Sequence, residues 1–302
     1  MALIENAILI AGPTASGKSA LALDWARREG GVIVNADSMQ VYSVLRVLTA
    51  RPSAEDLAKA PHFLYGHVDP REPYSTGEWL RDVERLWKEG AFAGRTIVFV
   101  GGTGLYFRAL LGGLSAMPAI PSEIRERWRE RLSREGAETL HRVLRERDAK
   151  AAEMIRPADG QRIVRALEII EASGRSILSW RGTPGEPLVD QESAHKIVIE
   201  LERGLLRKRV DRRFDGMVAD GALQEVAALM ALAPDPARPA MKAIGVRELL
   251  AFMAGRMTLE QAVEQAKAAS RQYAKRQTTW FRHQLGTDWE RAASPADATA
   301  TL

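Results

Sequence analysis

The first thirty residues hold the feature that most constrains the fold: an apolar run, a glycine-rich turn and an amphipathic segment, in that order. The run Ala7–Ala11 is apolar at every position, which is typical of a parallel strand buried on both faces. The turn Gly12–Ser19 fits G-x-x-x-x-G-K-[ST], and an apolar stripe predicts a helix over Ser19–Arg28. Backbone N–H groups of such a turn bind phosphate oxygens at the helix start. We expect Lys18 to neutralise the terminal phosphate and the Ser19 hydroxyl to coordinate Mg²⁺.

The rest of the N-terminal third continues the alternation of strand and helix. Further buried strands are predicted over Val32–Val34 and Thr96–Val100, and strand character returns at Ile197–Ile199. The expected fold class is therefore α/β: a P-loop NTPase-like parallel sheet flanked by helices, with a mainly helical insertion domain.

The insertion is predicted from a change in composition. After residue 113 the chain becomes rich in arginine, with apolar residues at helical spacing and Ser122 as the expected N-cap of the first helix. We expect residues 1–113 and 195–302 to form the core and residues 114–194 to form the insertion. Helical periodicity continues over 205–230 and 244–284, and the last dozen residues, rich in Ala and Thr, are expected to be frayed.

Composition excludes several kinds of chemistry. The chain has no cysteine, so disulfides, thiolate zinc sites, iron–sulfur clusters and cysteine nucleophiles are excluded. Lys and Arg number 43 against 39 Asp and Glu, a net charge of +4 that permits a nucleic-acid partner without requiring one. No apolar stretch approaches the ~18 residues that span a membrane, and no signal peptide precedes the glycine turn. We expect a cytoplasmic protein with no membrane partner.

One carboxylate is expected near the phosphate loop. An ordinary NTPase has a strand that ends in Asp and helps to hold Mg²⁺, but the strand over Thr96–Val100 is followed by glycine. Asp37 follows the second strand instead, and the carboxyl edge of a parallel sheet faces the ligand. From position alone Asp37 is a general base, a metal ligand or a cap of the next turn, and these interpretations stay open.

Seven blocks of sequence together resemble one family. The blocks occur in a fixed order and cover most of the chain: Gly12–Ser19, Ala36–Tyr42, Ala60–His62, Val100–Tyr106, Asp159–Glu168, Ala243–Arg247 and Tyr273–Trp280. The chain closely resembles the bacterial tRNA dimethylallyltransferase family, also called tRNA isopentenyltransferases. The first block is common to many NTPases, whereas the blocks Ala36–Tyr42 and Tyr273–Trp280 are highly specific.

The resemblance implies a reaction. A dimethylallyl group would pass from dimethylallyl diphosphate to N6 of adenosine 37 in tRNAs that read codons beginning with U, and diphosphate would be released. The phosphate loop would then hold the donor's diphosphate and not ATP. The implied catalytic residues are Asp37 as general base, Thr103 and Lys18. The implied diphosphate ligands, with Mg²⁺ on Ser19, are Gly12, Pro13, Thr14, Ala15, Ser16, Gly17, Lys18, Ser19 and Arg213, although Arg212 competes with Arg213 for the last role.

The implied macromolecular partner is the tRNA anticodon stem-loop, whose target base must leave its stack to be modified. The residues implied to contact tRNA are Asp37, Ser38, Met39, Gln40, Thr103, Arg125, Gln161, Arg162, Ile163, Val164, Arg165, Lys242, Arg247, Arg271 and Lys275. From the residues alone, a solvated helix face is the favoured interpretation of the segment 161–165. Lys267, Arg271 and Lys275 recur every four residues with no acidic residue between positions 265 and 287, which predicts a basic face for phosphates. We expect a monomer.

The chain departs from the family pattern after Tyr42. Val44 and Leu48 replace glycines and Arg46 replaces an acidic residue, so a backbone conformation that needs glycine would be lost here. Three alternatives stay open: a prenyltransferase acting on free adenine nucleotides, a P-loop small-molecule kinase, and a tRNA-binding protein that has lost its chemistry.

Overall fold

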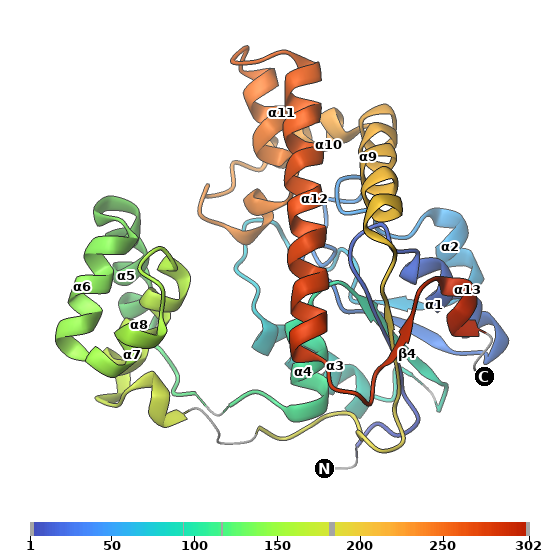
Figure 1. Ribbon diagram of the computed structural model, residues 1–302, viewed down its shortest axis with the longest axis horizontal. Helices are drawn as coiled ribbons and strands as arrows, with labels where there is room; N and C mark the ends of the chain where they lie inside the picture. Colours follow the sequence, from blue (N-terminus) through green and yellow to red (C-terminus); the bar gives the residue numbers. More distant parts are fainter. Residues whose placement is uncertain (1–2, 93, 116, 181–184, 300–302) are drawn as a thin grey trace. The chain divides into compact units, whose positions relative to one another are not determined.

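The computed structural model describes residues 3–92, 94–115, 117–180 and 185–299 (Figure 1). The chain divides into two compact units. One comprises Met1–Leu111 with Pro187–Leu302, and the other comprises Gly112–Glu186.

The larger unit is built on a six-stranded, wholly parallel sheet with the order β3-β2-β4-β1-β5-β6. Its strands are β1 (Ile8–Ala11), β2 (Val32–Asn35), β3 (His62–Phe63), β4 (Ile97–Gly101), β5 (His195–Ile199) and β6 (Glu290–Ala292). Every residue of β1, β2 and β4 is buried, which explains why these strands are apolar at nearly every position. The prediction of an α/β fold with a parallel sheet is confirmed.

Helices cover both faces of this sheet. Leu9 and Phe99 share one core with Trp79, whereas Ile10 and Val98 share the other with Leu21. The helical segments of this unit are α1 (Lys18–Arg28), α2 (Ala54–Lys59), α3 (Thr76–Lys88), α4 (Gly104–Gly112), α9 (Arg203–Ala219), α10 (Ala222–Ala231), η2 (Pro239–Lys242), α11 (Val246–Met253), α12 (Leu259–Gln284) and α13 (Pro295–Thr299). Among the described residues, no helix is both long and apolar enough to cross a membrane.

Three expectations about this C-terminal half are wrong. The helix expected over 205–230 is divided between α9 and α10 by Gly221, whose φ of 106° ends regular helix. The helix expected over 244–284 is divided between α11 and α12 in the same way, with Gly255 at a φ of 68°. The end of the chain is not frayed through residue 299, because β6 pairs with β5 and Ala298 of α13 is fully buried. Residues 300–302 lie outside the described part.

The smaller unit is helical. It contains α5 (Ser122–Glu135), α6 (Ala137–Arg147), α7 (Ala149–Met154), α8 (Gly160–Ser173) and the short η1 (Ile177–Trp180). Trp128 is buried in a separate core with Leu140 and Leu167, and its indole N–H donates to a carboxylate oxygen of Glu171 at 2.8 Å. The expected cap at Ser122 is wrong, because Ser122 is the first helical residue and its hydroxyl hydrogen-bonds Glu123 at 3.2 Å.

Candidate active site

Three loops meet at the carboxyl edge of the sheet. The phosphate loop follows β1, the segment with Asp37 follows β2, and the segment with Thr103 follows β4. Because β4 pairs with both β1 and β2, the three loops are neighbours. The sheet order therefore brings together side chains that are far apart in sequence.

The phosphate loop places a buried lysine at the start of α1. Gly17 adopts a φ of 94°, and a Cβ there would lie 2.9 Å from Cγ of Pro295, so both conformation and space favour glycine. Lys18 Nζ donates to the carbonyl oxygen of Pro13 at 3.2 Å. Burial lowers the pKa of Lys18 to about 8, while the Asp37 carboxylate acts in the opposite direction.

Helix α9 adds two arginines beside this loop. Arg213 Nη1 donates to the Thr14 hydroxyl at 3.3 Å, and Arg209 Nη1 lies 3.5 Å from the carbonyl oxygen of Ser16. Desolvation lowers the pKa of the Arg213 guanidinium below its usual value, and Asp37 opposes this shift. Arg212 is exposed, so Arg213 is the arginine of the pair that faces the loop.

Asp37 is positioned by Asn35, the last residue of β2. Asn35 Oδ1 accepts from the Asp37 backbone N–H at 2.9 Å, and its amide nitrogen donates to the carbonyl oxygens of Asp37 at 2.9 Å and Leu64 at 3.0 Å. Asp37 Oδ1 accepts from the Met39 N–H at 2.9 Å. Within the described residues Oδ2 has no hydrogen-bond donor, so it is the oxygen available to take a proton.

The charges at this edge do not neutralise one another directly. In the part of the chain that the structure describes, no ion pair within 4 Å joins Asp37 to Lys18 or Arg213, although each cation senses the Asp37 charge. A desolvated cation without a carboxylate partner is costly unless an anionic ligand pairs with it. The arrangement therefore favours an anion on the loop with a separate carboxylate beside it.

Thr103 connects the β4 loop to the Asp37 segment. Its hydroxyl oxygen accepts from the Ser38 N–H at 2.9 Å and lies 3.2 Å from the Ser38 hydroxyl. Thr103 thereby fixes the backbone next to Asp37.

Gln277 of α12 connects two of the three loops. Its Oε1 accepts from the Thr14 N–H at 2.9 Å and its Nε2 donates to the carbonyl oxygen of Gly102 at 2.9 Å. A Cβ on Gly102 would lie 2.2 Å from Gln277 Nε2 and 3.2 Å from Asp37 Oδ2, so only glycine allows this approach. Gln277 therefore holds the phosphate loop and the loop after β4 in register.

Comparison with known proteins identifies the family. A family model described as IPP transferase matches residues 40–284, and one described as isopentenyl transferase matches residues 5–65. The chain is 60% identical over 299 residues to the tRNA dimethylallyltransferase of Mesorhizobium japonicum, covering 99% of this chain and 93% of the relative. The chain belongs to the tRNA dimethylallyltransferase family. The relative from Chelativorans sp. is 62% identical over 288 residues, covering 95% of this chain and 99% of that one.

Solved structures of tRNA dimethylallyltransferases share the fold. The tRNA isopentenylpyrophosphate transferase of Bacillus halodurans is 32% identical with a TM-score of 0.68, covering 98% of this chain and 93% of that one. A eukaryotic dimethylallyltransferase acting on tRNA is 25% identical with a TM-score of 0.81, covering 98% of this chain and 77% of that one. The resemblance inferred from the seven sequence blocks is thus confirmed at the level of the family.

Three tyrosines sense the charge of the Asp37 carboxylate. Desolvation, and then the charge of Asp37, raise the pKa of Tyr65, Tyr106 and Tyr273. The phenols therefore stay neutral at physiological pH and add no charge to the surroundings of Asp37.

Ser19 is the expected metal ligand. It is exposed at the first turn of α1, and no group of three or more His, Asp or Glu side chains placed to hold a metal ion occurs among the described residues. Mg²⁺ commonly binds through few protein oxygens and keeps substrate oxygens and water as its other ligands. The donor set here fits that mode, with the Ser19 hydroxyl as the protein ligand.

The altered loop after Tyr42 does not need the expected glycines. Neither Val44 nor Leu48 has a positive φ, and Leu48 is buried. The Gln40 amide nitrogen donates to the carbonyl oxygens of Thr49 at 2.8 Å and Ala50 at 3.1 Å, and its Oε1 has no donor among the described residues. The loop is therefore closed by the segment expected to contact tRNA.

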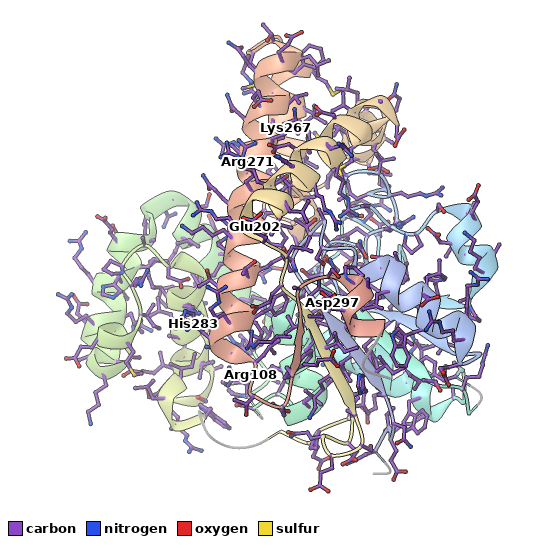
Figure 2. All side chains as sticks on the ribbon, turned by 45° about the vertical axis from the view of Figure 1, so that its right-hand side comes forward. Arg108, Glu202, Lys267, Arg271, His283 and Asp297 are labelled. Atoms are coloured by element: carbon purple, nitrogen blue, oxygen red, sulfur yellow. The ribbon has the colours of Figure 1, made fainter. Side chains whose placement is uncertain are left out.

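The predicted basic face of α12 is largely neutralised by α9. Arg271 pairs with Asp211 at 2.5 Å, and Lys267 pairs with Asp215 at 2.7 Å (Figure 2). The expectation of a basic face considered only residues 265–287, whereas the balancing charges come from the neighbouring α9 and, for Lys267, also from Glu264 on α12 at 3.1 Å. Lys275 is exposed and has no ion pair with any described residue.

The insertion residues divide by exposure. Gln161 and Arg162 are exposed on α8, whereas Ile163 and Val164 are buried in the core of this unit. Arg162 lies 3.4 Å from Asp159 and Arg165 lies 3.2 Å from Glu168. Arg125 is half-buried on α5. Any contact of the segment 161–165 with RNA would therefore come from its exposed and half-buried side chains.

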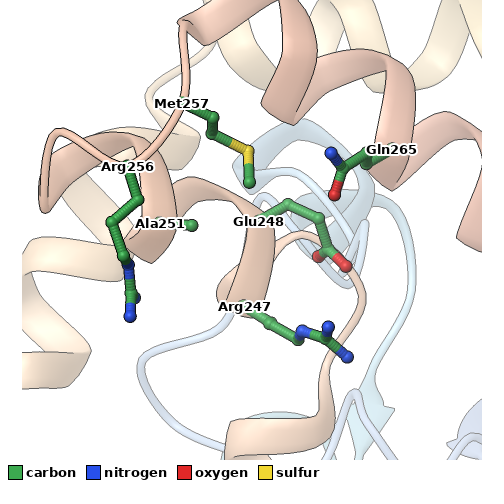
Figure 3. Close-up of a pocket in the computed structure, with 6 residues that line it drawn as sticks. All are labelled: Arg247, Glu248, Ala251, Arg256, Met257 and Gln265. Atoms are coloured by element: carbon green, nitrogen blue, oxygen red, sulfur yellow. The ribbon is translucent and has the colours of Figure 1, made fainter.

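Lys242 of η2 and Arg247 of α11 are exposed. Arg247 lines a hollow of about 230 Å³ between α11 and α12 (Figure 3). The lining is Arg247, Glu248, Ala251, Arg256, Met257 and Gln265. No residue of the phosphate loop lines this hollow, so it is separate from the site described above.

Sequence reasoning missed Asn35, Arg209 and Gln277. Gln277 lies within the block Tyr273–Trp280 and between the buried Ala274 and Phe281, and a polar residue within a buried stripe is a signal of a specific hydrogen bond. Asn35 gives the same signal at the end of an apolar strand. Arg209 lies four residues before Arg213 on one helix face, so that spacing would have found it.

Proposed function

We propose that this protein transfers a dimethylallyl group from dimethylallyl diphosphate to N6 of adenosine 37 in tRNAs that read codons beginning with U, and releases diphosphate. The observation that carries the proposal is the arrangement of three side chains. Lys18 and Arg213 are desolvated and have no ion pair within the described residues, and Asp37 beside them keeps its Oδ2 without a donor in that same part of the chain. The family membership and the activity named for the relatives support it.

The phosphate loop would bind the diphosphate of the donor. Its backbone N–H groups, the start of α1, Lys18 and Arg213 face the oxygens on which negative charge grows as the C–O bond breaks, and they stabilise that charge. Arg209 supports the same loop from α9.

Asp37 would act as the general base. The N6 amine attacks C1 of the dimethylallyl group, the C–O bond electrons leave with the diphosphate, and the new N–C bond forms. N6 then holds one proton too many, which Asp37 Oδ2 accepts. Asn35 and Thr103 keep the carboxylate in place during this step.

Mg²⁺ would be held by Ser19 and by diphosphate oxygens. When bound, it supplies charge neutralisation for the leaving group.

The tRNA anticodon stem-loop would contact several exposed or half-buried side chains after the base leaves its stack. These are Asp37, Ser38, Met39, Gln40, Thr103, Arg125, Gln161, Arg162, Arg165, Lys242, Arg247 and Lys275. We propose a monomer acting in the cytoplasm.

The test uses purified protein, Mg²⁺, isotope-labelled dimethylallyl diphosphate and, side by side, unmodified tRNA and AMP. Label in tRNA that disappears when adenosine 37 is replaced is the expected result. Label in AMP alone would reassign the protein to prenyl transfer on free nucleotides. Consumption of ATP without transfer of label would favour a kinase.

A further inference from the structure

Glu225 of α10 accepts hydrogen bonds from consecutive backbone N–H groups of the loop after Tyr42. Its Oε1 accepts from Arg46 N at 2.6 Å and from Val47 N, and its Oε2 accepts from Leu48 N at 2.9 Å. Glu225 lies 177 residues from Leu48, so the carboxylate is a tertiary contact and not a local cap. One side chain therefore fixes the direction of three successive peptide groups.

The same loop is bound from its other side by the segment beside Asp37. Gln40 Nε2 donates to the carbonyl oxygens of Thr49 and Ala50, at 2.8 and 3.1 Å. Arg51 Nη1 donates to the carbonyl oxygens of Tyr42 and Ser43, at 2.9 and 3.1 Å. A continuous set of hydrogen bonds thus runs from Glu225 through the loop to Gln40.

These bonds add to the loop's own contacts, which are the buried side chains of Leu45 and Leu48 and turn bonds such as that from the Ala50 N–H to the Val47 carbonyl oxygen at 2.9 Å. Arg46 is exposed, and the segment 43–50, all of it within the described residues, belongs to no helix and pairs with no strand of the sheet. Buried or half-buried N–H groups that lose their acceptor are destabilised, and a loop that can move will move to satisfy them. Removing Glu225 would leave the Val47 and Leu48 N–H groups without an acceptor among the described residues, while the Arg46 N–H keeps the Val44 carbonyl oxygen at 3.0 Å. We therefore expect the loop to loosen locally, with the sheet and the phosphate loop unchanged.

We infer that Glu225 is a positioning residue for tRNA: it holds the 46–48 backbone, which holds Gln40 in the orientation that meets the flipped base and its neighbours. This inference rests on the proposed function, and it assigns Glu225 no contact with the diphosphate. Its effect is expected on tRNA and not on the prenyl donor.

The test compares Glu225→Gln and Glu225→Ala with Gln224→Ala, an exposed neighbour on α10. Glu225→Gln keeps the shape of the side chain but replaces one accepting oxygen by an NH₂ group, which then faces a backbone N–H of the loop. We expect the KM for tRNA to rise about tenfold in Glu225→Gln and further in Glu225→Ala, with the KM for dimethylallyl diphosphate and pyrophosphate binding unchanged. Amide hydrogen exchange at residues 46–48 should be faster in both Glu225 variants than in the wild-type protein. Gln224→Ala should exchange at the wild-type rate.

A separate readout keeps this inference distinct from the proposed function. If wild type labels no tRNA, the proposed function fails, whereas the exchange at 46–48 still reports whether Glu225 holds the loop. The positioning role is wrong if the wild-type protein labels tRNA but the Glu225 variants keep the wild-type KM for tRNA. It is also wrong if the variants raise the KM for tRNA and the KM for dimethylallyl diphosphate equally. If Glu225→Ala misfolds and no longer binds pyrophosphate, Glu225→Asp, which is shorter by one methylene, replaces it in the comparison of the two KM values.

Discussion

Arg213 at the sheet edge and Arg165 in the insertion are both arginines on amphipathic helices, yet their surroundings differ. Arg213 has no ion pair within the described chain, and desolvation lowers its pKa. Arg165 lies 3.2 Å from Glu168, three residues along its own helix. A cation that is desolvated without a partner is positioned for a ligand, whereas a partly exposed, locally paired cation contributes little to stability.

This contrast predicts two classes of effect. Changes at the sheet edge should reduce chemistry or donor binding strongly and depend little on salt. Changes in the insertion should weaken tRNA binding modestly and depend on salt, because screening acts on exposed charges.

The largest effect is expected from Asp37→Asn, which keeps the hydrogen bond from Met39 but removes the base. General-base catalysis contributes about 10² to 10⁴ in rate, so single-turnover transfer should fall by about 10³-fold. Pyrophosphate affinity, measured by calorimetry, should be nearly unchanged. Asp24→Asn, at a partly exposed position on α1, is the control, and substantial turnover in Asp37→Asn would remove the base role.

A smaller loss is expected from Gln277→Glu. The change removes the donor to Gly102 and places a negative charge beside the phosphate loop. An unsatisfied buried polar group costs about 1–3 kcal/mol, so the KM for dimethylallyl diphosphate should rise about 10- to 100-fold. Gln272→Glu, an exposed position on the same helix, carries the same charge change. Equal KM values for these two variants would show that Gln277 does not couple the loops.

The lowered pKa of Lys18 predicts opposite pH trends for pyrophosphate affinity and for the stability of the ligand-free protein. Its folded pKa of about 8 lies below the unfolded value of 10.5. Between these values the unfolded chain holds a proton that the folded chain lacks, so this lysine makes the ligand-free protein more stable as pH rises through that window. Pyrophosphate affinity should instead fall about tenfold per pH unit above 8, because binding needs the charged form.

Calorimetry at pH 7, 8 and 9 measures the binding trend. Lys18→Met removes the titrating group but leaves the ionisation of pyrophosphate itself, so the difference between the two proteins isolates Lys18. A parallel slope in both would contradict the assignment.

The smallest effect is expected from the double variant Arg162→Gln, Arg165→Gln. Each phosphate contact that the double variant removes should reduce the salt slope of tRNA binding by about 0.7 to 0.9. Affinity at moderate salt should fall several-fold, with pyrophosphate binding unchanged. Arg142→Gln on α6 is the matched exposed control. An unchanged salt slope would mean that this face of α8 is only solvated.

The sequence was most informative where structure is local. The strands β1, β2 and β4, the phosphate loop and the place of Asp37 follow from apolar runs and turns within a few residues. The bond between Gln277 and Thr14 joins residues 263 apart, so no local pattern encodes it. The pair Arg271–Asp211 joins residues 60 apart, which is why a basic face was expected where α9 supplies the balancing charge. The prediction of a frayed end was wrong because an Ala-rich composition does not indicate whether a residue such as Ala298 is buried.

The position of Pro295 against Gly17 has a consequence for the order in which the protein assembles. The phosphate loop lies near the N-terminus and leaves the ribosome early, whereas the edge strand β6 and helix α13 are made last. A nascent chain can form β1 and β4 long before it contains the residues that pack on the outside of the loop. On the proposed function, the diphosphate site would therefore be completed late in synthesis. We expect a fusion partner placed directly after α13 to disturb that site although it is attached about 280 residues from Gly17.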